Sequence, residues 1–541
     1  MQQTVAILGG GVAGLSAAQE LVERGLHVRV YERKPVMGGK ARSIPVPNSG
    51  VGGRQSLPGE HGFRFFPGFY KHVTDTMHRI PFGDHGNTFD NLTVATRILL
   101  ARAGQTEITW VARCPTTLED LRAFLMELFT PLGVPLDETA YFVSRLLLVA
   151  TSCTERRLAE YENIPWWNFI AASKMSNAYQ TDLGQGLTRS LVAMRAEESS
   201  TRTVGCTQLQ LLYGLICPER VFDRLLCGPT SDVWINPWTQ YLQKLGVEFF
   251  PGTRVVSFET NGTHVTGTRV ETASGQSSIS ADFYVAALPV EVMAALMTDD
   301  LKRAAPSLAN LDKLKTRWMN GIQFYLSKDE PLVNGHAIYL NSPWALTSIS
   351  QRQFWNNVDF RQYGDGTIGG ILSVDVSDWE APGVVYGKPA QECNVVQIKD
   401  EVWTQLKQHL NNSGATPIED ANLVAWFLDP DIEFPNPSQA TNAEPLLINT
   451  AGSLQYRPEA QVELENFFVA SDYVRTYTDI ACMEAANEAA RRAVNCLLAA
   501  SGSNAQPAQL WPLEEPDFLK PLQEIDRIRF SLSLPHHLES T

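Results

Sequence analysis

The sequence predicts an α/β protein in which separated segments of the chain build one parallel sheet and α+β segments are inserted between them. Three observations support this fold class. A strand, a glycine-rich turn and a helix open the chain, a β-rich region follows near residue 246, and a buried strand precedes a helix near residue 467. A chain of 541 residues exceeds one typical core, so we expect more than one domain.

The start of the chain has the pattern of a dinucleotide-binding βαβ unit. Val5–Leu8 is an apolar strand candidate, residues 9–14 read Gly-Gly-Gly-Val-Ala-Gly, and apolar residues then recur at helical spacing. Gly9 permits the tight turn, Gly11 lets a pyrophosphate approach the backbone, and Gly14 lets the helix pack on the strand. The positive end of the helix dipole then faces the phosphates. We therefore assign cofactor binding to Gly9, Gly11, Val12, Ala13 and Gly14.

A second β-rich run, His27–Glu32, ends in an acidic residue 18 positions after Gly14. This separation suits a carboxylate that accepts hydrogen bonds from a ribose. The same carboxylate would repel the additional phosphate of an NADP-type ligand. Glu32 therefore favours a dinucleotide without that phosphate.

The middle of the chain is expected to leave the parallel sheet and return to it. Alternating residues and turns at Pro251-Gly252, Asn261-Gly262 and Ser274-Gly275 predict hairpins from residue 247 onward. A strand that Pro289 ends then follows. We interpret this region as a β-meander followed by a return to the parallel sheet.

Two stretches, near residues 85–205 and 295–440, have helical periodicity and aromatic clusters, with a strand-like run at 321–326. We interpret them as inserted pieces of a substrate domain. The predicted domains are a nucleotide-binding domain in three parts (1–84, 206–295 and 441–500), a substrate domain in two parts (85–205, mainly helical, and 296–440, sheet plus helices) and a C-terminal tail (501–541).

Composition excludes several classes of partner. The formal net charge of −15 argues against nucleic acid, because its binders concentrate Lys and Arg. No uncharged apolar run reaches the roughly 20 residues that a membrane-spanning helix needs, and the first motif leaves no room for a secretion signal. We expect a cytoplasmic protein with no metal site and with reduced, scattered cysteines: Cys114, Cys153, Cys206, Cys217, Cys227, Cys393, Cys482 and Cys496.

Residues 33–43, Arg-Lys-Pro-Val-Met-Gly-Gly-Lys-Ala-Arg-Ser, follow Glu32 directly. They resemble the second dinucleotide signature of the flavin amine oxidase and phytoene desaturase superfamily, which uses it to bind FAD. The resemblance implies that Arg33 opens this signature and that Gly38 and Gly39 let the backbone reach the pyrophosphate. Lys40 stands where the family usually has Arg, which keeps the positive charge but loses bidentate geometry.

Three further blocks match the superfamily in its order. Residues 59–70 resemble the loop beside the isoalloxazine ring, residues 470–476 resemble an AGD-type turn, and residues 478–486 resemble the start of the MEGA helix. The resemblance implies that an acid accepts hydrogen bonds from the flavin chain, that the helix start points at the pyrimidine end, and that one backbone position meets the adenine. The implied residues are Gly62, Phe63, Arg64, Val255, Asp472 and Met483.

The resemblance therefore implies an FAD-binding, Rossmann-like domain of glutathione-reductase type, built from discontinuous segments, plus the inserted α+β substrate domain. FAD is the expected cofactor. Fold alone does not select the chemistry, because related enzymes include amine or amino-acid oxidases as well as enzymes of apolar terpenoids. Gln323 lies, by alignment, where amine oxidases commonly carry Lys.

The final block, residues 445–494, is most similar to hydroxysqualene dehydroxylase-like and phytoene-desaturase-like proteins. The leading hypothesis is a desaturase or dehydrogenase that transfers a hydride from an apolar polyene or terpenoid to flavin N5. The alternatives are an amine or amino-acid oxidase and a non-catalytic flavin-binding pathway partner. The candidate catalytic residues, chosen only for their proximity to flavin motifs, are His61, Arg64 and Tyr473.

Two apolar sets remain open to more than one interpretation. The first could line a lipid tunnel or form ordinary core: Trp166, Trp167, Met175, Met194 and Phe354. The second follows helical spacing near the C-terminus and could contact a membrane, cover the substrate entrance or dock on its own domain: Phe518, Leu519, Leu522, Ile525 and Ile528. The sequence indicates no oligomeric state.

Overall fold

A computed structural model describes residues 3–103, 115–216, 221–411, 416–437 and 439–539. Cys114 and Cys217 lie outside these residues. The described cysteines form no disulfide with one another. None of the described helices combines the length and the apolar character needed to cross a membrane.

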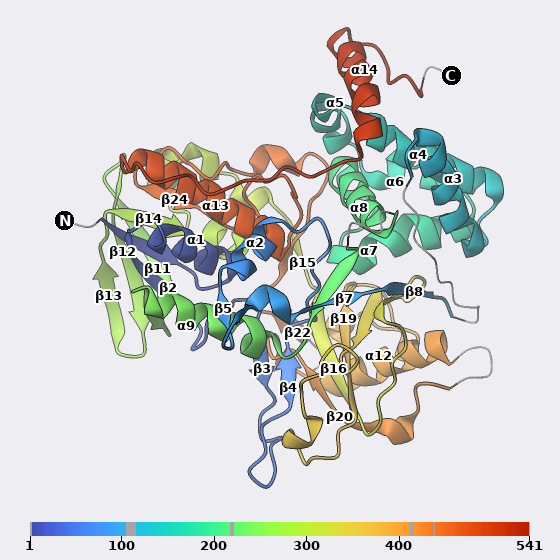
Figure 1. The fold of residues 1–541 in the computed structure, drawn as a ribbon, viewed down its shortest axis with the longest axis horizontal. Coiled ribbons are helices and arrows are strands. Elements are labelled where there is room, and N and C mark those ends of the chain that lie inside the picture. Colours follow the sequence, from blue (N-terminus) through green and yellow to red (C-terminus); the bar gives the residue numbers. More distant parts are fainter. Residues whose placement is uncertain (1–2, 104–114, 217–220, 412–415, 438, 540–541) are drawn as a thin grey trace.

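One sheet has five parallel strands that come from three distant parts of the sequence (Figure 1). Helices α1 (Val12–Val22) and α13 (Met483–Ala500) pack against each other beside it, although they lie near opposite ends of the sequence. This arrangement confirms the predicted mixed α/β fold with a parallel, Rossmann-like sheet. The strands, in spatial order, are β10 (Glu248–Pro251), β2 (His27–Glu32), β1 (Thr4–Leu8), β14 (Phe283–Ala286) and β24 (Phe467–Val469).

The prediction of a hairpin around Pro251-Gly252 was wrong. Strand β10 instead extends the parallel sheet alongside β2. The ring of Phe250 stacks on Tyr31 with centroids 4.8 Å apart, so an aromatic pair accompanies this edge pairing. The meander consists of the next three strands, β11 (Arg254–Thr260), β12 (Val265–Thr272) and β13 (Gly275–Ile279).

A second sheet has six strands and is covered on one face by α12 (Val395–Leu410). Neighbouring strands are antiparallel except for the last two in the order below, which are parallel. The predicted strand at residues 321–326 belongs to a fully buried strand of this sheet. In spatial order the strands are β20 (Leu423–Leu428), β16 (Asn320–Leu326), β19 (Gly370–Val376), β18 (Leu346–Ser350), β17 (Gly335–Tyr339) and β8 (Arg97–Ala101).

A helical layer forms a separate hydrophobic core beside the two sheets (Figure 1). Trp166 is fully buried in it and contacts the rings of Phe142 and Phe169. The main helices are α3 (Leu118–Phe129), α4 (Leu136–Thr151), α5 (Thr154–Ala159), α6 (Trp166–Phe169), α7 (Leu187–Val192) and α8 (Thr201–Ile216).

The C-terminal helix α14 (Lys520–Ser531) docks on α4 and α5. Its Asp526 is fully buried and accepts hydrogen bonds from Nε of Arg156 at 2.9 Å and from the backbone of Cys153 at 2.9 Å. Ile525 and Ile528, by contrast, are about half exposed, at 48% and 56%. The helix therefore docks through a buried ion pair, while these two apolar side chains face away from the contact.

Shorter elements complete the connections around the sheets. The short helices are α2 (His72–His78), α9 (Asn236–Lys244), α10 (Val290–Ala295) and α11 (Asp299–Ala304). The short strands nearest the site are β3 (Ser43–Pro45), β4 (Pro58–Glu60), β7 (Leu92–Ala95) and β9 (Asp223–Leu226).

Candidate functional site

A large cavity lies where the parallel sheet, the loop at residues 59–70 and the six-stranded sheet meet. Its free volume is about 1700 Å³, its open mouth included. Of the residues predicted to bind the cofactor, all except Gly14 line it: Gly9, Gly11, Val12, Ala13, Glu32, Arg33, Gly38, Gly39, Lys40, Gly62, Phe63, Arg64, Val255, Asp472 and Met483. The fold thus gathers blocks that are hundreds of residues apart, while the role of each residue stays a prediction.

The glycines that open the chain are required by close backbone contacts. Gly9 has a φ of +111°, and a Cβ there would lie 2.3 Å from the carbonyl oxygen of Ala287. A Cβ on Gly14 would lie 1.9 Å from the carbonyl oxygen of Gly9. Gly14 therefore closes the turn from behind instead of lining the cavity. This packing leaves the amino end of α1 open toward the cavity, as a phosphate site requires.

The second glycine pair lies against the first. Gly38 donates its backbone N–H to the carbonyl oxygen of Gly10 at 2.8 Å, and a Cβ on Gly39 would lie 3.0 Å from Cα of Gly11. Glu32 is held at the same place, because its carboxylate accepts hydrogen bonds from the backbone of Gly10 at 2.7 Å and of Lys34 at 2.8 Å. The two turns are therefore packed closely enough that Gly38 and Gly39 have no room for larger side chains.

His61 belongs to a buried charged cluster at the edge of the cavity. Its Nδ1 lies 2.7 Å from Oδ2 of Asp429. Burial alone would lower the pKa of His61, but the carboxylates around it, Asp429 first among them, raise it. Asp429 and Asp431 could join His61 around a metal ion. Arg42 already pairs with Asp431, however, so a protein cation compensates much of this negative charge.

Arg64 and Tyr473 differ in position, and the catalytic role of each stays a prediction. Arg64 is half-buried and donates hydrogen bonds to the carbonyl oxygens of Gly62 at 2.8 Å and Phe63 at 3.0 Å, which braces the loop beside the cavity. Tyr473 is fully buried and does not line the cavity. Gln323 is buried beneath the same loop, where its side-chain oxygen accepts a hydrogen bond from the backbone of Glu60 at 3.1 Å.

Asp375 is a cavity residue that the sequence did not single out. It lies on β19, and a Cβ on Gly62 would approach its Oδ1 to 2.7 Å. Burial raises its pKa to about 7, although Arg64 and His61 act in the opposite direction. A carboxyl group perturbed by burial in a cavity is typical of functional sites. One acid in the otherwise uncharged run Ile371–Val376 was the signal available in the sequence.

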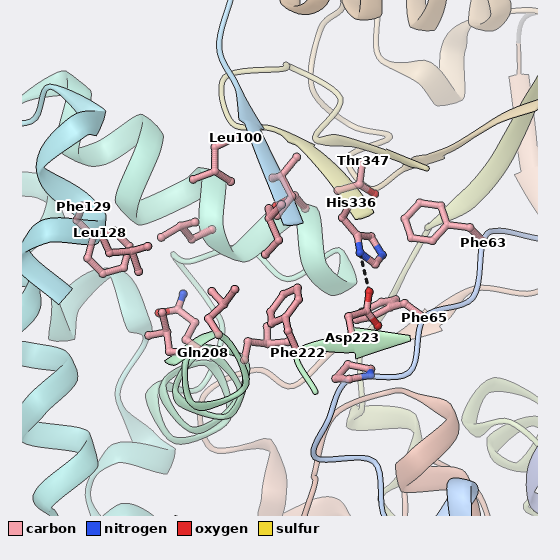
Figure 2. Close-up of a pocket in the computed structure, with 18 of the residues that line it drawn as sticks. Phe63, Phe65, Leu100, Leu128, Phe129, Gln208, Phe222, Asp223, His336 and Thr347 are labelled. Carbon is pink, nitrogen blue, oxygen red and sulfur yellow. Dashed lines mark ion pairs between the residues drawn. The ribbon is translucent and has the colours of Figure 1, made fainter. Parts of the chain in front are cut away.

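A second, strongly apolar cavity adjoins the first (Figure 2). Its free volume is about 1030 Å³, and its lining contains Phe63, Phe65 and Met319, which also line the first cavity. One face of α8 supplies several more lining residues at positions i, i+3, i+4 and i+7: Gln208, Leu211, Leu212 and Leu215. None of the residues suggested as tunnel candidates from the sequence lines it, and Trp166, Met194 and Phe354 are buried core instead.

One ion pair interrupts the apolar lining at the end near Phe63 and Phe65 (Figure 2). Nδ1 of His336 lies 2.8 Å from Oδ2 of Asp223. Both residues are buried, with exposed fractions of 9% and 1%. They come from β17 and β9, so no local pattern in the sequence brings them together.

A glycine turn at the end of the first strand, a second glycine pair against it and a carboxylate at the end of the second strand together have the pattern of a dinucleotide-binding site. The chain belongs to the flavin-containing amine oxidoreductase family, whose model matches residues 12–498. The predicted family and the predicted flavin-dependent oxidoreductase are thereby confirmed.

Individual relatives agree with this assignment. A zeta-carotene desaturase of Synechocystis sp. is 22% identical over 536 residues, which cover 92% of this chain and 97% of that protein. A 15-cis-phytoene desaturase of Synechococcus elongatus is 22% identical over 481 residues, covering 87% and 90%. The solved structure of wild-type putrescine oxidase bound to putrescine has a TM-score of 0.59 at 13% identity, covering 93% and 99% of the two chains. At that identity the structural likeness concerns the fold alone.

Proposed function

We propose that this chain is an FAD-dependent desaturase that removes two hydrogen atoms from a long apolar polyene or terpenoid. The observation that carries the proposal is the apolar cavity, which shares Phe63, Phe65 and Met319 with the dinucleotide cavity. The transfer of a hydrocarbon chain from water to such a lining lowers its free energy. The two carotenoid desaturases among the relatives, similar over most of their length, support the same substrate class.

In this proposal the parallel-sheet domain, in the three predicted parts, holds FAD. The amino end of α1, with Gly11 beside it, would bind the phosphates, Glu32 the adenosine ribose, and Asp472 the ribityl chain. The start of α13 at Met483 would present backbone N–H groups to the pyrimidine end. Bound FAD would supply the acceptor for a hydride. The predicted substrate domain would place the isoprenoid chain and exclude water.

The amine oxidase alternative fits the second cavity less well. A cationic amine needs a free carboxylate or an aromatic cage, whereas the one carboxylate among the described lining residues, Asp223, is already paired with His336. Gln323, at the position where amine oxidases commonly carry Lys, is occupied by its bond to the backbone of Glu60. The non-catalytic alternative predicts bound flavin that no substrate reduces.

Anaerobic mixing of the flavin-loaded protein with phytoene or zeta-carotene in detergent tests the proposal. We expect the visible absorbance of oxidised flavin to bleach, and no bleaching with an amine or amino-acid panel. Leu211→Trp should fill the apolar cavity and slow bleaching at least tenfold without loss of flavin, as expected for overpacking at a substrate site. Leu245→Trp, at an exposed position elsewhere, is the matched control. Bleaching by amines alone would contradict the proposal.

A further inference from the structure

A row of buried polar groups crosses the face of the six-stranded sheet that borders the two cavities. Thr347 on β18 lies opposite Ile338 of β17 on one side and Asp375 of β19 on the other. His336 shares the face of Ile338, because side chains two residues apart in a strand point the same way. Nε2 of His336, Oγ1 of Thr347 and Oδ1 of Asp375 are buried and make no hydrogen bond within the described protein. Native proteins leave few such atoms without a reason.

Of these three groups, His336 is the one that borders the apolar cavity and also has a partner that orients it. Oδ2 of Asp223 lies 2.8 Å from its Nδ1, and Asp223 is itself fixed because its Oδ1 accepts a hydrogen bond from the backbone of Phe66 at 3.1 Å. The ring centroid of His336 lies 5.3 Å from that of Phe63 and 4.8 Å from that of Phe65. Since both phenylalanines line both cavities, the imidazole lies near the place where the two cavities adjoin, and Figure 2 shows it beside Phe63 and Phe65 in the apolar cavity.

The position of Asp223 beside Nδ1 decides which ring nitrogen of His336 can accept a proton. An imidazole that donates Nδ1–H to a carboxylate keeps a lone pair on Nε2, and the carboxylate stabilises the ring once it becomes protonated. The other polar groups of the lining are hydroxyls and an amide, which do not accept a proton near neutral pH. Among the described lining residues of the apolar cavity, His336 is the one imidazole.

We propose that His336, oriented by Asp223, is the catalytic residue that accepts the proton which the substrate loses on desaturation. The inference rests on the proposed function and names the base for it. One C–H bond breaks and its electron pair leaves with the hydrogen as a hydride for the oxidised flavin. The C–H bond of the adjacent carbon breaks, its proton goes to Nε2 of His336, and its electron pair becomes the second bond of C=C. Substrate loses two hydrogen atoms and flavin gains two electrons.

The test compares flavin reduction and substrate binding in the flavin-loaded protein. His336→Gln should slow anaerobic bleaching by at least about a hundredfold, the usual contribution of a positioned base. The dissociation constant for the polyene, measured by quenching of intrinsic fluorescence, should change by less than about twofold, because the apolar lining stays intact. His336→Gln combined with Asp223→Asn guards against misfolding from an unpaired buried carboxylate. His85→Gln, at an exposed loop position, is the control.

A second readout does not depend on turnover. Nitrogen-15 NMR of histidine-labelled holoprotein should show a ring whose neutral form carries its proton on Nδ1, a signal absent in His336→Gln. A ring protonated on Nε2 would overturn the inference, as would unchanged bleaching in both variants while wild-type protein bleaches. A hundredfold loss in Asp375→Asn with none in His336→Gln would also overturn it and assign the base to Asp375. If no isoprenoid bleaches wild-type flavin, the proposed function itself fails.

Discussion

Replacing Asp375 by Asn should change how stability depends on pH. Burial raises the pKa of Asp375 to about 7, from an ordinary value of 3.8. The folded protein therefore binds more protons than the unfolded chain between these values. Its free energy of unfolding falls as pH rises through this window and levels off above it. Since one pKa unit is worth about 1.4 kcal/mol, ionisation of Asp375 costs the folded state up to about 4 kcal/mol at high pH.

The uncharged amide avoids this cost. Asp375→Asn should be more stable than wild type by up to about 4 kcal/mol near about pH 8.5, and by only about 1 kcal/mol near about pH 4.5. Urea unfolding at both pH values, at equal flavin content, measures the difference. Asp84→Asn removes the same charge at an exposed loop position and should show no such trend. If wild type and Asp375→Asn respond to pH in parallel, the carboxyl group is not perturbed and the reasoning fails.

Three further predictions concern the glycine turn, the C-terminal helix α14 and the thiol of Cys482. Gly14→Ala should abolish flavin retention, measured by absorbance after gel filtration, because its Cβ would lie 1.9 Å from the carbonyl oxygen of Gly9. Asp526→Asn should loosen α14 by about 1.5 to 3 kcal/mol, the worth of a hydrogen bond to a charged group, because Arg156 keeps its pair with Glu160; deuterium uptake should rise in α14 while flavin stays bound. Cys482 should resist alkylation at pH 8 by mass spectrometry, since burial raises its pKa to about 12.

The parts of the fold that could be predicted from sequence are those with local causes. A Cβ on Gly14 would meet the carbonyl oxygen of Gly9 within the same βαβ unit, so residue type and spacing suffice to predict this turn, whereas the close contact of Gly9 is with the distant Ala287. Strand β10 shows the limit of this reasoning. Its turn signal at Pro251-Gly252 is equally compatible with a hairpin and with an edge strand, and only the distant β2 decides between them.

The same distinction between local motifs and long-range contacts applies to the candidate site. The predicted residues of the dinucleotide cavity each match a family motif or position, whereas Asp375 in the same cavity matches none. Asp223 and His336 belong to none, and their pairing depends on how β9 and β17 are placed by the rest of the fold. The lining residues of α8 have the helical spacing of any buried helix face, so periodicity predicts burial but not that the face borders a cavity.

The loop at residues 59–70 borders both cavities, although their linings differ in chemistry. On one side Arg64 donates a hydrogen bond to Gly62 within the loop, and Asp375 of β19 lies against Gly62. Charge and hydrogen bonding therefore hold the loop on the side of the dinucleotide cavity. On the other side Phe63 and Phe65 turn its aromatic surface to the apolar cavity. A single backbone segment therefore orients both the cofactor side and the substrate side. A change that displaces this loop should alter where along a polyene the hydride leaves, even where flavin binding is unaffected.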